Sequence, residues 1–497
     1  LWPTVDVYIP TYNESLEVVS DTVLSAQNLD YPADKIRIYM LDDGRRESFE
    51  AFAKSAGVGY ITRANNQHAK AGNLNNALGQ TDGELICVFD CDHIPTAGFL
   101  QATVGGFLED AKLAMVQTPH YFYSQDPFER NLGVGEELPR EGELFYGPVQ
   151  KGNDFWNATF FCGSCAVIRR EALDETDGFA VETVTEDAHT ALRFQRKGWR
   201  TAFVSLPLAA GLATERLSLH IGQRARWARG MTQILRVDNP LFGRGLTLAQ
   251  RLCYLNAMLH FQFALPRVVF ITAPLAYLLL GQNIIASSAS MIFAYALPHL
   301  FHAIWTNSRL NGRFRYTFWG EIYESVLCFH LIKPTLVTLW DPKKGSFNVT
   351  EKGGLLEKSF FDISAVRPHL VVAFLLALGL GSGLVRFYWN EYYAIERDVM
   401  LLNVFWAGFS LITLLAAIAA AREQRQVRTN VRVPLVLPAS IYLADGHVLK
   451  TRTLDVSLGG VRLANPLEEA FDGEVEDVEI RLDDQSVVLP ARLVDAD

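Results

Sequence analysis

Leu85-Ile86-Cys87-Val88-Phe89-Asp90-Cys91-Asp92 is the stretch that decides the fold of the first half of the chain. Five apolar residues followed at once by two acids predict a central strand that ends in a polar loop. Residues 5–9 and 36–41 have the same form, and the second run ends at Asp42-Asp43. Helical patterns separate these runs, so we expect a parallel, doubly wound sheet with its acids at one edge.

The composition changes along the 497 residues, which are more than one domain usually holds. Residues 1–240 have the pattern of a soluble α/β domain, 264–420 contain long apolar runs, and 425–497 return to short alternating patterns. We therefore expect three domains, at 1–250, 251–420 and 421–497. The net charge of -10 argues against nonspecific binding of nucleic acid but permits a small phosphate ligand held by local arginines.

Four apolar runs, near 264–281, 289–306, 368–389 and 398–420, reach or approach the roughly 20 residues that a bilayer crossing needs. Residues 319–340 are amphipathic, and we expect them on the membrane surface. Basic residues concentrate in 307–318, 341–367 and 422–432, which places 1–250, 307–367 and 421–497 in the cytosol. Buried helices of a large soluble protein explain the repeated runs and their charge asymmetry less well.

Two remaining features concern the cysteines and the start of the chain. Cys162 and Cys165 form a C-x-x-C, but no second pair at similar spacing exists to complete a zinc site, so we expect free cytosolic thiols. No signal peptide is visible. Leu1 stands where a methionine would, and a strand follows almost at once, so we expect further residues before it.

Carboxylates dominate the polar residues at the predicted strand ends. Asp42-Asp43 and Asp90-x-Asp92 suit a hard cation, Mg²⁺ or Mn²⁺, that is shared with the oxygens of a nucleotide diphosphate. A lone D-x-D is a weak signal, since any surface turn can show one. Its position directly after an apolar strand raises it well above that background.

Two further elements supply the other groups that sugar transfer needs. In Thr185-Glu186-Asp187 a carboxylate can take the proton of an acceptor hydroxyl. In Gln223-Arg224-Ala225-Arg226-Trp227 an arginine can balance a departing diphosphate and a tryptophan can carry a sugar ring. An Arg-Trp pair alone usually means a helix packed on a core, but here four elements occur in one domain.

Taken together, the D-D, D-x-D, T-E-D and Q-x-x-R-W set resembles the processive family-2 glycosyltransferases, which include cellulose, chitin and hyaluronan synthases. The run from Phe347 to Gly353 is similar to the F-x-V-T-x-K-G gating-loop motif of cellulose synthases. Arg428-x-x-x-Arg432, with the Asp455–Gly460 run, resembles the PilZ signature for cyclic di-GMP. The resemblance spans 10–460 and implies a GT-A-type catalytic domain, transmembrane helices and a C-terminal β-barrel.

The resemblance implies an inverting enzyme of the bacterial inner membrane that polymerises UDP-glucose into β-1,4-glucan, exports it, and is activated by cyclic di-GMP. Its partners would be the growing glucan, membrane lipids and a periplasmic accessory subunit, with no nucleic acid. The family has membrane helices before its catalytic domain, and this chain shows none. Two alternatives stay open: a chitin- or hyaluronan-like synthase, and a cyclic di-GMP receptor whose transferase domain is inactive.

The resemblance also assigns roles residue by residue. Asp187, beside Glu186, would be the base, Arg226 would stabilise leaving UDP, and Trp227 would stack on the acceptor. Asp92, supported by Asp90, would hold the metal. Substrate contacts are implied for Tyr12, Glu14, Asp43, Lys70, Asp90, Gln117, His120, Cys162 and Gln223, and for Thr350 and Lys352 in a gating loop at 343–361.

The remaining implied residues are regulatory. Those expected at cyclic di-GMP are Arg425, Arg428, Arg432, Asp455, Ser457, Gly459 and Gly460. Phe347 belongs to the gating loop, which the family tethers through an acid that would be Glu215 here, paired with Arg428. A plainer interpretation makes Glu215 a solvated surface acid and the arginines a patch that attracts anionic lipid.

Overall fold

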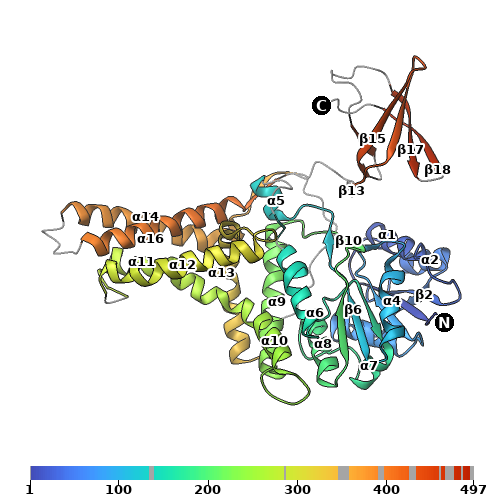
Figure 1. Ribbon diagram of the computed structural model, residues 1–497, viewed down its shortest axis with the longest axis horizontal. Helices are drawn as coiled ribbons and strands as arrows, with labels where there is room; N and C mark the ends of the chain where they lie inside the picture. The colour runs from blue at the N-terminus through green and yellow to red at the C-terminus, as the bar shows by residue number, and fades with distance from the viewer. Residues whose placement is uncertain are drawn as a thin grey trace. The chain divides into compact units, whose positions relative to one another are not determined.

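The computed structural model describes residues 2–133, 139–140, 142–284, 287–344, 358–389, 397–424, 433–457, 460–464, 475–482 and 485–492. These residues form two compact units, Leu1–Arg425 and Gln426–Asp497. The first unit contains an α/β domain and a set of long helices, and the second is built from strands (Figure 1).

A seven-stranded sheet forms the centre of the α/β domain, in the order β3-β2-β1-β4-β8-β6-β9. Its strands are β1 (Val5–Thr11), β2 (Ile36–Asp42), β3 (Gly59–Ile61), β4 (Leu85–Val88), β6 (Leu113–Gln117), β8 (Ala166–Arg169) and β9 (Arg200–Phe203). A smaller sheet joins β5 (Ile94–Pro95), β10 (Ala209–Gly211) and β7 (Tyr121–Phe122).

The expectation of a wholly parallel sheet was wrong at one strand. β8 runs antiparallel to both of its neighbours, β4 and β6. Its first residue, Ala166, pairs with Val88 at the end of β4, so the chain enters β8 from the edge where the acids lie. This entry brings residues 161–165 to the carboxyl ends of β1, β2 and β4.

Helices cover both faces of the sheet. In chain order they are α1 (Leu16–Gln27), α2 (Glu47–Ala56), α3 (Ala69–Leu78), α4 (Phe99–Glu109), α5 (Pro127–Leu132), the π-helical turn η1 (Phe145–Val149), α6 (Gln150–Phe155), α7 (Arg170–Glu175), α8 (Glu186–Arg196), α9 (Leu217–Val237) and α10 (Leu248–His260). Polar residues set several starts: Ser15 caps α1, and Thr247 with Gln250 forms a capping box on α10.

Alternation along the strands divides the core into two layers. In β4, Leu85 and Cys87 face one side, where they meet α1, α2 and α4, whereas Ile86 and Val88 face the other side, with α3, α8 and α9. Helix α9 belongs to two cores, because its second half packs under the sheet and its first half packs with the long helices. The sequence predicted this two-sided arrangement correctly.

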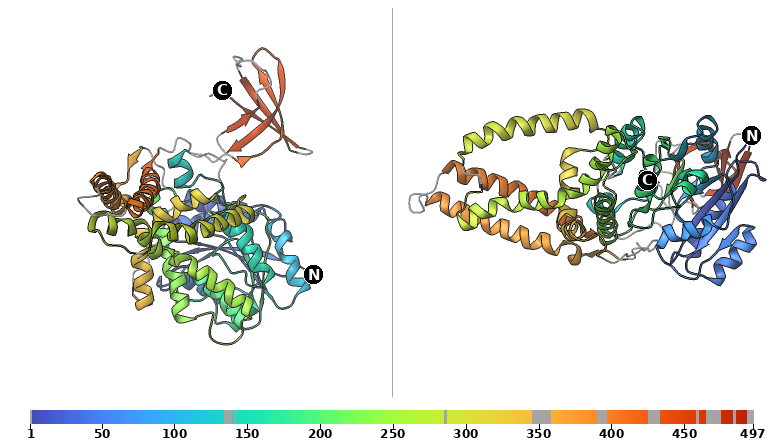
Figure 2. Two further views of the ribbon diagram at one scale, coloured as in Figure 1. Left: turned by 60° about the vertical axis from the view of Figure 1, so that its left-hand side comes forward. Right: turned by 90° about the horizontal axis from the view of Figure 1, so that it is seen from below.

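The long helices extend to one side of the α/β domain (Figure 2). They are the short turn η2 (Phe261–Phe263), α11 (Ala264–Leu280), α12 (Ala289–Asn311), α13 (Thr317–Trp340), α14 (Ile363–Tyr388) and α16 (Arg397–Ala419). Among the described residues, four helical stretches are long and apolar enough to cross a membrane: Leu248–Leu280, Thr317–Trp340, Ile363–Tyr388 and Arg397–Ala419.

Three of these four stretches contain spans that the sequence predicted, and the expectation for α12 needs correction. α12 was expected to cross, but Pro298, His299 and His302 lower its hydropathy and it is not among the four. α13 was expected to lie on the surface, yet its length and composition would also allow a crossing. Half of the apolar stretch of α13 is buried within the protein, against 22–28% for the other three.

Two short strands, β11 (Phe360–Phe361) and β12 (Arg422–Glu423), pair beside the ends of α14 and α16. The second unit is a curled antiparallel sheet made of β13 (Val433–Pro434), β14 (Pro438–Leu443), β15 (Val448–Ser457), β16 (Gly460–Leu463), β17 (Val475–Leu482) and β18 (Gln485–Pro490) (Figure 1). Its buried apolar residues alternate along β14 and β17, where Ala439 pairs with Ile480 and Ile441 pairs with Val478.

Candidate active site and regulatory site

Two fixed arginines neutralise the first acidic pair. Arg46 Nη2 lies 2.9 Å from Asp42 Oδ1, and Arg63 Nη2 lies 2.6 Å from Asp43 Oδ2. A second bond of 2.6 Å, from Arg63 Nε to Asp43 Oδ1, makes that pair bidentate. Asp42 is fully buried and also accepts from the hydroxyl of Tyr60. This pair therefore has its charges balanced within the protein.

The loop after β1 is fastened to the same place. Tyr12 N and Thr11 Oγ1 both donate to Glu14 Oε2, at 2.8 and 2.9 Å. Arg46 Nη1 donates to Glu14 O at 2.5 Å, which links this loop to Asp42. Tyr12 remains exposed, with 45% of its surface accessible, and Asp43 N donates to Thr11 O. The structure thus brings Tyr12, Glu14 and Asp43 together, as predicted.

The second cluster is built around Lys70, at the start of α3. Its Nζ forms an ion pair with Asp90 Oδ1 and donates to Gly163 O at 2.6 Å. Gly163 has a φ of +88°, and an ideal Cβ on it would lie 3.2 Å from Asp187 Oδ2 and 3.5 Å from Lys70 Nζ. Glycine therefore suits this backbone and leaves open the space between the two side chains.

Asp187 lies at the start of α8, where burial raises its pKa to about 7, with a further contribution from the negative charge of Glu186. Burial also raises the pKa of Glu186, against the opposing charge of Lys70. Ala188 N donates to Asp187 Oδ1 at 2.8 Å. Within the part of the chain that the structure describes, neither acid forms an ion pair. A carboxylate with this pKa can exchange protons at neutral pH.

Asp90, Asp92 and His93 each offer a ligand atom, and these atoms lie within 4.8 Å of one another. His93 is buried, and no described group makes a hydrogen bond with its Nε2. Two carboxylates and an imidazole nitrogen fit a divalent cation that takes its remaining ligands from a diphosphate. Sequence analysis missed His93, and its position directly after the D-x-D was the available signal.

The segment Phe161–Ser164 lies over Gln117, which is fully buried. Gln117 Oε1 accepts from Cys162 N at 2.9 Å, and its Nε2 donates to Ser164 O at 2.8 Å. His120 Nε2 also lies 2.9 Å from Ser164 O. Gln117 and His120 thus support this segment, which includes Gly163 next to Asp187.

Burial shifts the pKa values of His120 and of Cys162 in this segment. It lowers the pKa of His120 to about 3, assisted by nearby His93, and it raises the pKa of the Cys162 thiol. His120 is therefore neutral at physiological pH. All six cysteines are free thiols in the structure, four of them buried.

Helix α9 presents the Q-x-x-R-W residues to the acids. Gln223, Arg226 and Trp227 share one face of the helix because they are three and four residues apart. Burial lowers the pKa of Arg226, and the charges of Glu186, Asp90 and Asp187 oppose this effect. Arg226 therefore lies near the T-E-D acids and near Asp90. Trp227 is 36% exposed, and the Arg224 guanidinium lies 4.1 Å from its ring.

A close contact holds α9 against the T-E-D segment. A Cβ on Gly230 would lie 2.4 Å from Thr185 Oγ1, so glycine is needed for this approach. Gln233 Oε1 accepts from Val184 N at 2.9 Å, and its Nε2 donates to Pro342 O at 2.8 Å. Sequence analysis singled out neither Gly230 nor Gln233, because their roles depend on contacts across the fold.

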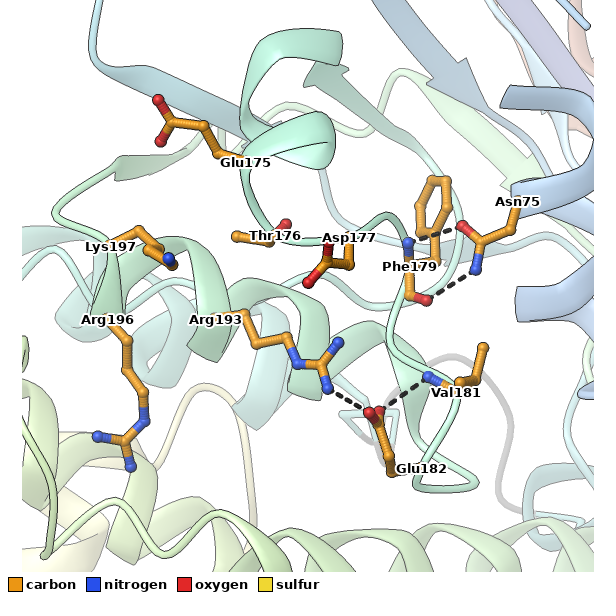
Figure 3. A pocket seen from close by; sticks show the side chains of 10 residues that line it. All are labelled: Asn75, Glu175, Thr176, Asp177, Phe179, Val181, Glu182, Arg193, Arg196 and Lys197. Carbon is orange, nitrogen blue, oxygen red and sulfur yellow. Dashed lines mark hydrogen bonds and ion pairs between the residues drawn. The ribbon is translucent and has the colours of Figure 1, made fainter. Parts of the chain in front are cut away.

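A pocket of about 420 Å³ is lined by Asn75, by residues between 175 and 182, and by the end of α8 (Figure 3). Asn75 exchanges two hydrogen bonds with the backbone of Phe179, and Arg193 pairs with Glu182 at 2.5 Å (Figure 3). None of its lining residues was predicted to bind substrate. These contacts anchor residues 179–182, which lead into Thr185-Glu186-Asp187.

The predicted regulatory residues fall into three groups. Glu215 precedes α9, and its backbone oxygen accepts from Arg130 Nη2 at 2.5 Å. In the second unit Asp455 and Ser457 lie on β15 and Gly460 begins β16, with Ser457 paired to Gly460 in an antiparallel hairpin. The others lie outside the described residues: Phe347, Thr350, Lys352, Arg425, Arg428, Arg432 and Gly459.

The α/β domain, with acids at the carboxyl edge of its sheet, has the form of a family-2 glycosyltransferase. Residues 6–177 match the family model described as Glycosyl transferase family 2. Residues 164–317 match the Cellulose synthase model, and residues 426–497 match the PilZ domain model.

Curated proteins are similar in sequence to this chain along almost its whole length. The cellulose synthase catalytic subunit [UDP-forming] of Komagataeibacter sucrofermentans is 53% identical over 508 residues, which cover 99% of this chain and 67% of that protein. The Pseudomonas fluorescens subunit of the same name is 58% identical over 93% of this chain and 62% of its own length. The chain belongs to the cellulose synthase family.

The chain is shorter than these relatives. It spans about a third of the cellulose synthase 1 of Komagataeibacter xylinus, to which it is 54% identical over its whole length. It spans about two thirds of the catalytic subunits.

Proposed function

We propose that this chain is the catalytic part of a processive synthase that transfers glucose from UDP-glucose to the end of a growing β-1,4-glucan, which is cellulose. The observation that carries the proposal is the meeting of Asp187, Lys70 and Arg226 beside Asp90 and Asp92. Membership of the cellulose synthase family favours glucose over N-acetylglucosamine and favours an active enzyme over an inactive receptor.

Asp187 is the proposed base. Its carboxylate takes the proton of the acceptor hydroxyl as that oxygen attacks the anomeric carbon, which inverts an α-linked donor to a β-linked product. Lys70 and Arg226 carry the positive charge that the departing UDP needs. Asp90, Asp92 and His93 would hold Mg²⁺ or Mn²⁺, and the bound ion supplies further charge to the diphosphate.

Other residues position the two substrates. Tyr12, Glu14 and Asp43 border the nucleotide, because they are fastened together beyond the ends of β1 and β2. Trp227 stacks on the terminal sugar of the acceptor, with Gln223 and Cys162 beside it. A fixed aromatic platform allows the polymer to stay bound after each addition, which a processive enzyme requires.

The long helices conduct the product through the bacterial inner membrane. We place α11, α14 and α16 across the bilayer and α13 on its cytosolic surface, because α13 is the most buried of the four apolar stretches and packs against α9. Residues 1–250 and the second unit then lie in the cytosol. Lipids surround the helices, and a periplasmic accessory subunit receives the glucan.

Cyclic di-GMP is the proposed activator, bound by the second unit. Arg428 and Arg432 pair with its phosphates, with support from Arg425, while Asp455, Ser457 and the glycines 459 and 460 contribute further contacts to the dinucleotide. In the resting enzyme Glu215 tethers the loop that contains Phe347, Thr350 and Lys352. Glu215→Ala should then synthesise polymer without the dinucleotide, and full dependence on it would remove Glu215 from regulation.

The decisive experiment uses the full-length protein in lipid vesicles. UDP release and radiolabelled polymer are measured from UDP-glucose and from UDP-N-acetylglucosamine, with and without cyclic di-GMP. We expect glucan from UDP-glucose only, stimulated by the dinucleotide and stopped by excess EDTA. Incorporation of N-acetylglucosamine would indicate another polymer, and absence of UDP release with intact dinucleotide binding would indicate an inactive transferase.

A further inference from the structure

Glu423 is a fully buried carboxylate in the short strand that follows the last long helix, α16. Its Oε2 accepts from Arg130 Nη2 at 2.9 Å and from Asn131 Nδ2 at 3.0 Å. Its Oε1 accepts from Leu217 N at 2.6 Å. Three donors from α5 and α9 therefore converge on one acid from the far end of the first unit.

The bond to Leu217 gives α9 a cap that its own sequence lacks. Arg216 occupies the N-cap position with an extended backbone, and its side chain makes no capping bond. An acid at this place satisfies an orphan N–H and meets the positive end of the helix dipole. Glu423 supplies this group from 206 residues further along the chain.

The cap lies two to three helical turns from the residues that face the substrates. Gln223, Arg226 and Trp227 follow Leu217 in the same helix. An α-helix transmits a displacement of its first turn along its axis, since its backbone bonds link each turn to the next. The position of α9 therefore bears directly on where Arg226 and Trp227 lie.

Arg130 extends the contact to the connection before α9. It is buried, with 8% of its side chain exposed, and it donates to Glu215 O as well as to Glu423. Asn131 also binds the backbone before and after Glu423: its Nδ2 donates to Ala420 O at 2.8 Å, and its Oδ1 accepts from Gln424 N at 3.2 Å. Residues 420–424 are thereby fixed to α5 just before the second unit begins.

We propose that Glu423 is a positioning residue: it caps α9 and makes the placement of Arg226 and Trp227 depend on the docking of residues 420–424, which lead to the second unit. The proposal rests on the proposed function of α9. It differs from a purely stabilising ion pair because it requires α9 itself to loosen when the acid is lost.

The test compares Glu423→Gln with a matched control, Asp6→Asn. Asp6 is also fully buried and also accepts from a backbone N–H, that of Gly83 at 2.6 Å, and from an arginine, Arg170 at 3.3 Å. It lies at the start of β1, away from α9. Both changes remove one buried negative charge from a similar set of donors in the full-length protein.

The first measurement is hydrogen–deuterium exchange of peptides from 217–230, which does not depend on activity. Glu423→Gln should speed exchange at the first two turns of α9 at least about tenfold, whereas Asp6→Asn should not. The second measurement is turnover of UDP-glucose: Glu423→Gln should lower kcat about tenfold with KM within about twofold. A wild type that releases no UDP would defeat the proposed function while leaving the exchange result standing.

A rescue variant completes the test. Arg216→Ser places a good capping residue at the N-cap of α9, so in the Glu423→Gln background it should restore both exchange protection and turnover. Wild-type exchange in α9 with a folded Glu423→Gln protein would overturn the proposal. Glu423→Gln could fail to fold with and without Arg216→Ser while Asp6→Asn folds. Glu423 would then be required for folding of the whole protein, and the positioning role would also be overturned.

Discussion

Asp42-Asp43 and Glu186-Asp187 are two acidic pairs in one domain, and the structure treats them differently. Each acid of the first pair has its own arginine, Arg46 or Arg63, at 2.9 and 2.6 Å. The second pair forms no ion pair among the described residues, and burial with mutual repulsion raises the pKa of Asp187 to about 7. Similar residues are thus paired with arginines in one place and, at Asp187, form a carboxyl group that titrates near neutral pH in the other.

The difference lies in the supply of fixed cations more than in the acids themselves, and it matches the proposed division between binding and catalysis. A carboxylate paired with an arginine is held in place, which suits the recognition of a ligand. An acid left without such a partner keeps its proton affinity near neutrality, which suits proton transfer. The following predictions test that contrast, from the largest effect to the smallest.

Asp187→Asn should lower turnover about 10³-fold, within the range that a general base contributes. UDP-glucose binding should persist, because the nucleotide residues lie at the other pair. Turnover by UDP release and affinity by isothermal titration would be measured together. A mutant that retains more than a few per cent of activity would show that another group takes the proton.

The pH dependence of turnover should report the same carboxylate. Since Asp187 acts in its ionised form and its pKa is about 7, kcat should fall about fifty-fold between pH 7 and pH 5. Glu186→Gln removes the neighbouring charge and should move this fall in kcat to lower pH, by on the order of one unit. If kcat falls over the same pH range in the variant, the charge of Glu186 does not raise the pKa of Asp187.

Asp43→Asn should behave in the opposite manner to Asp187→Asn. Loss of the bidentate pair with Arg63 should raise KM for UDP-glucose about tenfold, while kcat stays within about threefold. Steady-state kinetics across donor concentrations would separate the two parameters. An equal fall of kcat and kcat/KM would instead place Asp43 in the transition state and break the contrast.

The two substitutions should also change stability with opposite signs. Asp43→Asn leaves Arg63 buried without its partner and should cost about 3–5 kcal/mol. Asp187 has a folded pKa above its unfolded value, so its ionised form weakens the fold above pH 7 and the effect vanishes below about pH 4. Asp187→Asn should therefore stabilise the protein at pH 8, by on the order of 1 kcal/mol after screening by solvent.

Thermal melting in detergent at pH 8 and at pH 4 would check this sign. A destabilised Asp187→Asn at pH 8 would mean that the carboxylate has a stabilising partner in the folded protein.

Local patterns were enough to predict much of the molecule. Apolar runs predicted β1, β2 and β4, and the acids after the second and third of these runs predicted the edge of the sheet where the site lies, because parallel strands align their carboxyl ends. The T-E-D and Q-x-x-R-W motifs singled out Asp187, Arg226 and Trp227, and the structure then placed Asp187 at the start of α8 and the other two on α9. Three of the four predicted spans fall within the apolar helical stretches.

The errors arose where an element depends on partners distant in sequence. The antiparallel direction of β8 is set by its entry beside Asp90, which no local pattern records. The surface position of α13 stays a prediction, because hydropathy alone does not measure how much of a helix packs against the protein. Gln233 was missed for the same reason, since only its contacts with Val184 and Pro342 distinguish it.

The sequence by itself determined which chemical groups are present, which strands and helices carry them, and which family the chain resembles, because these follow from periodicity and spacing along a few turns or strands. Only the tertiary structure decided which acids are neutralised, because Arg63 and Asp43 are 20 residues apart and Arg130 and Glu423 are 293 apart. Charge and burial are properties of neighbours in space, so the difference between Asp43 and Asp187 exists only once the chain has folded.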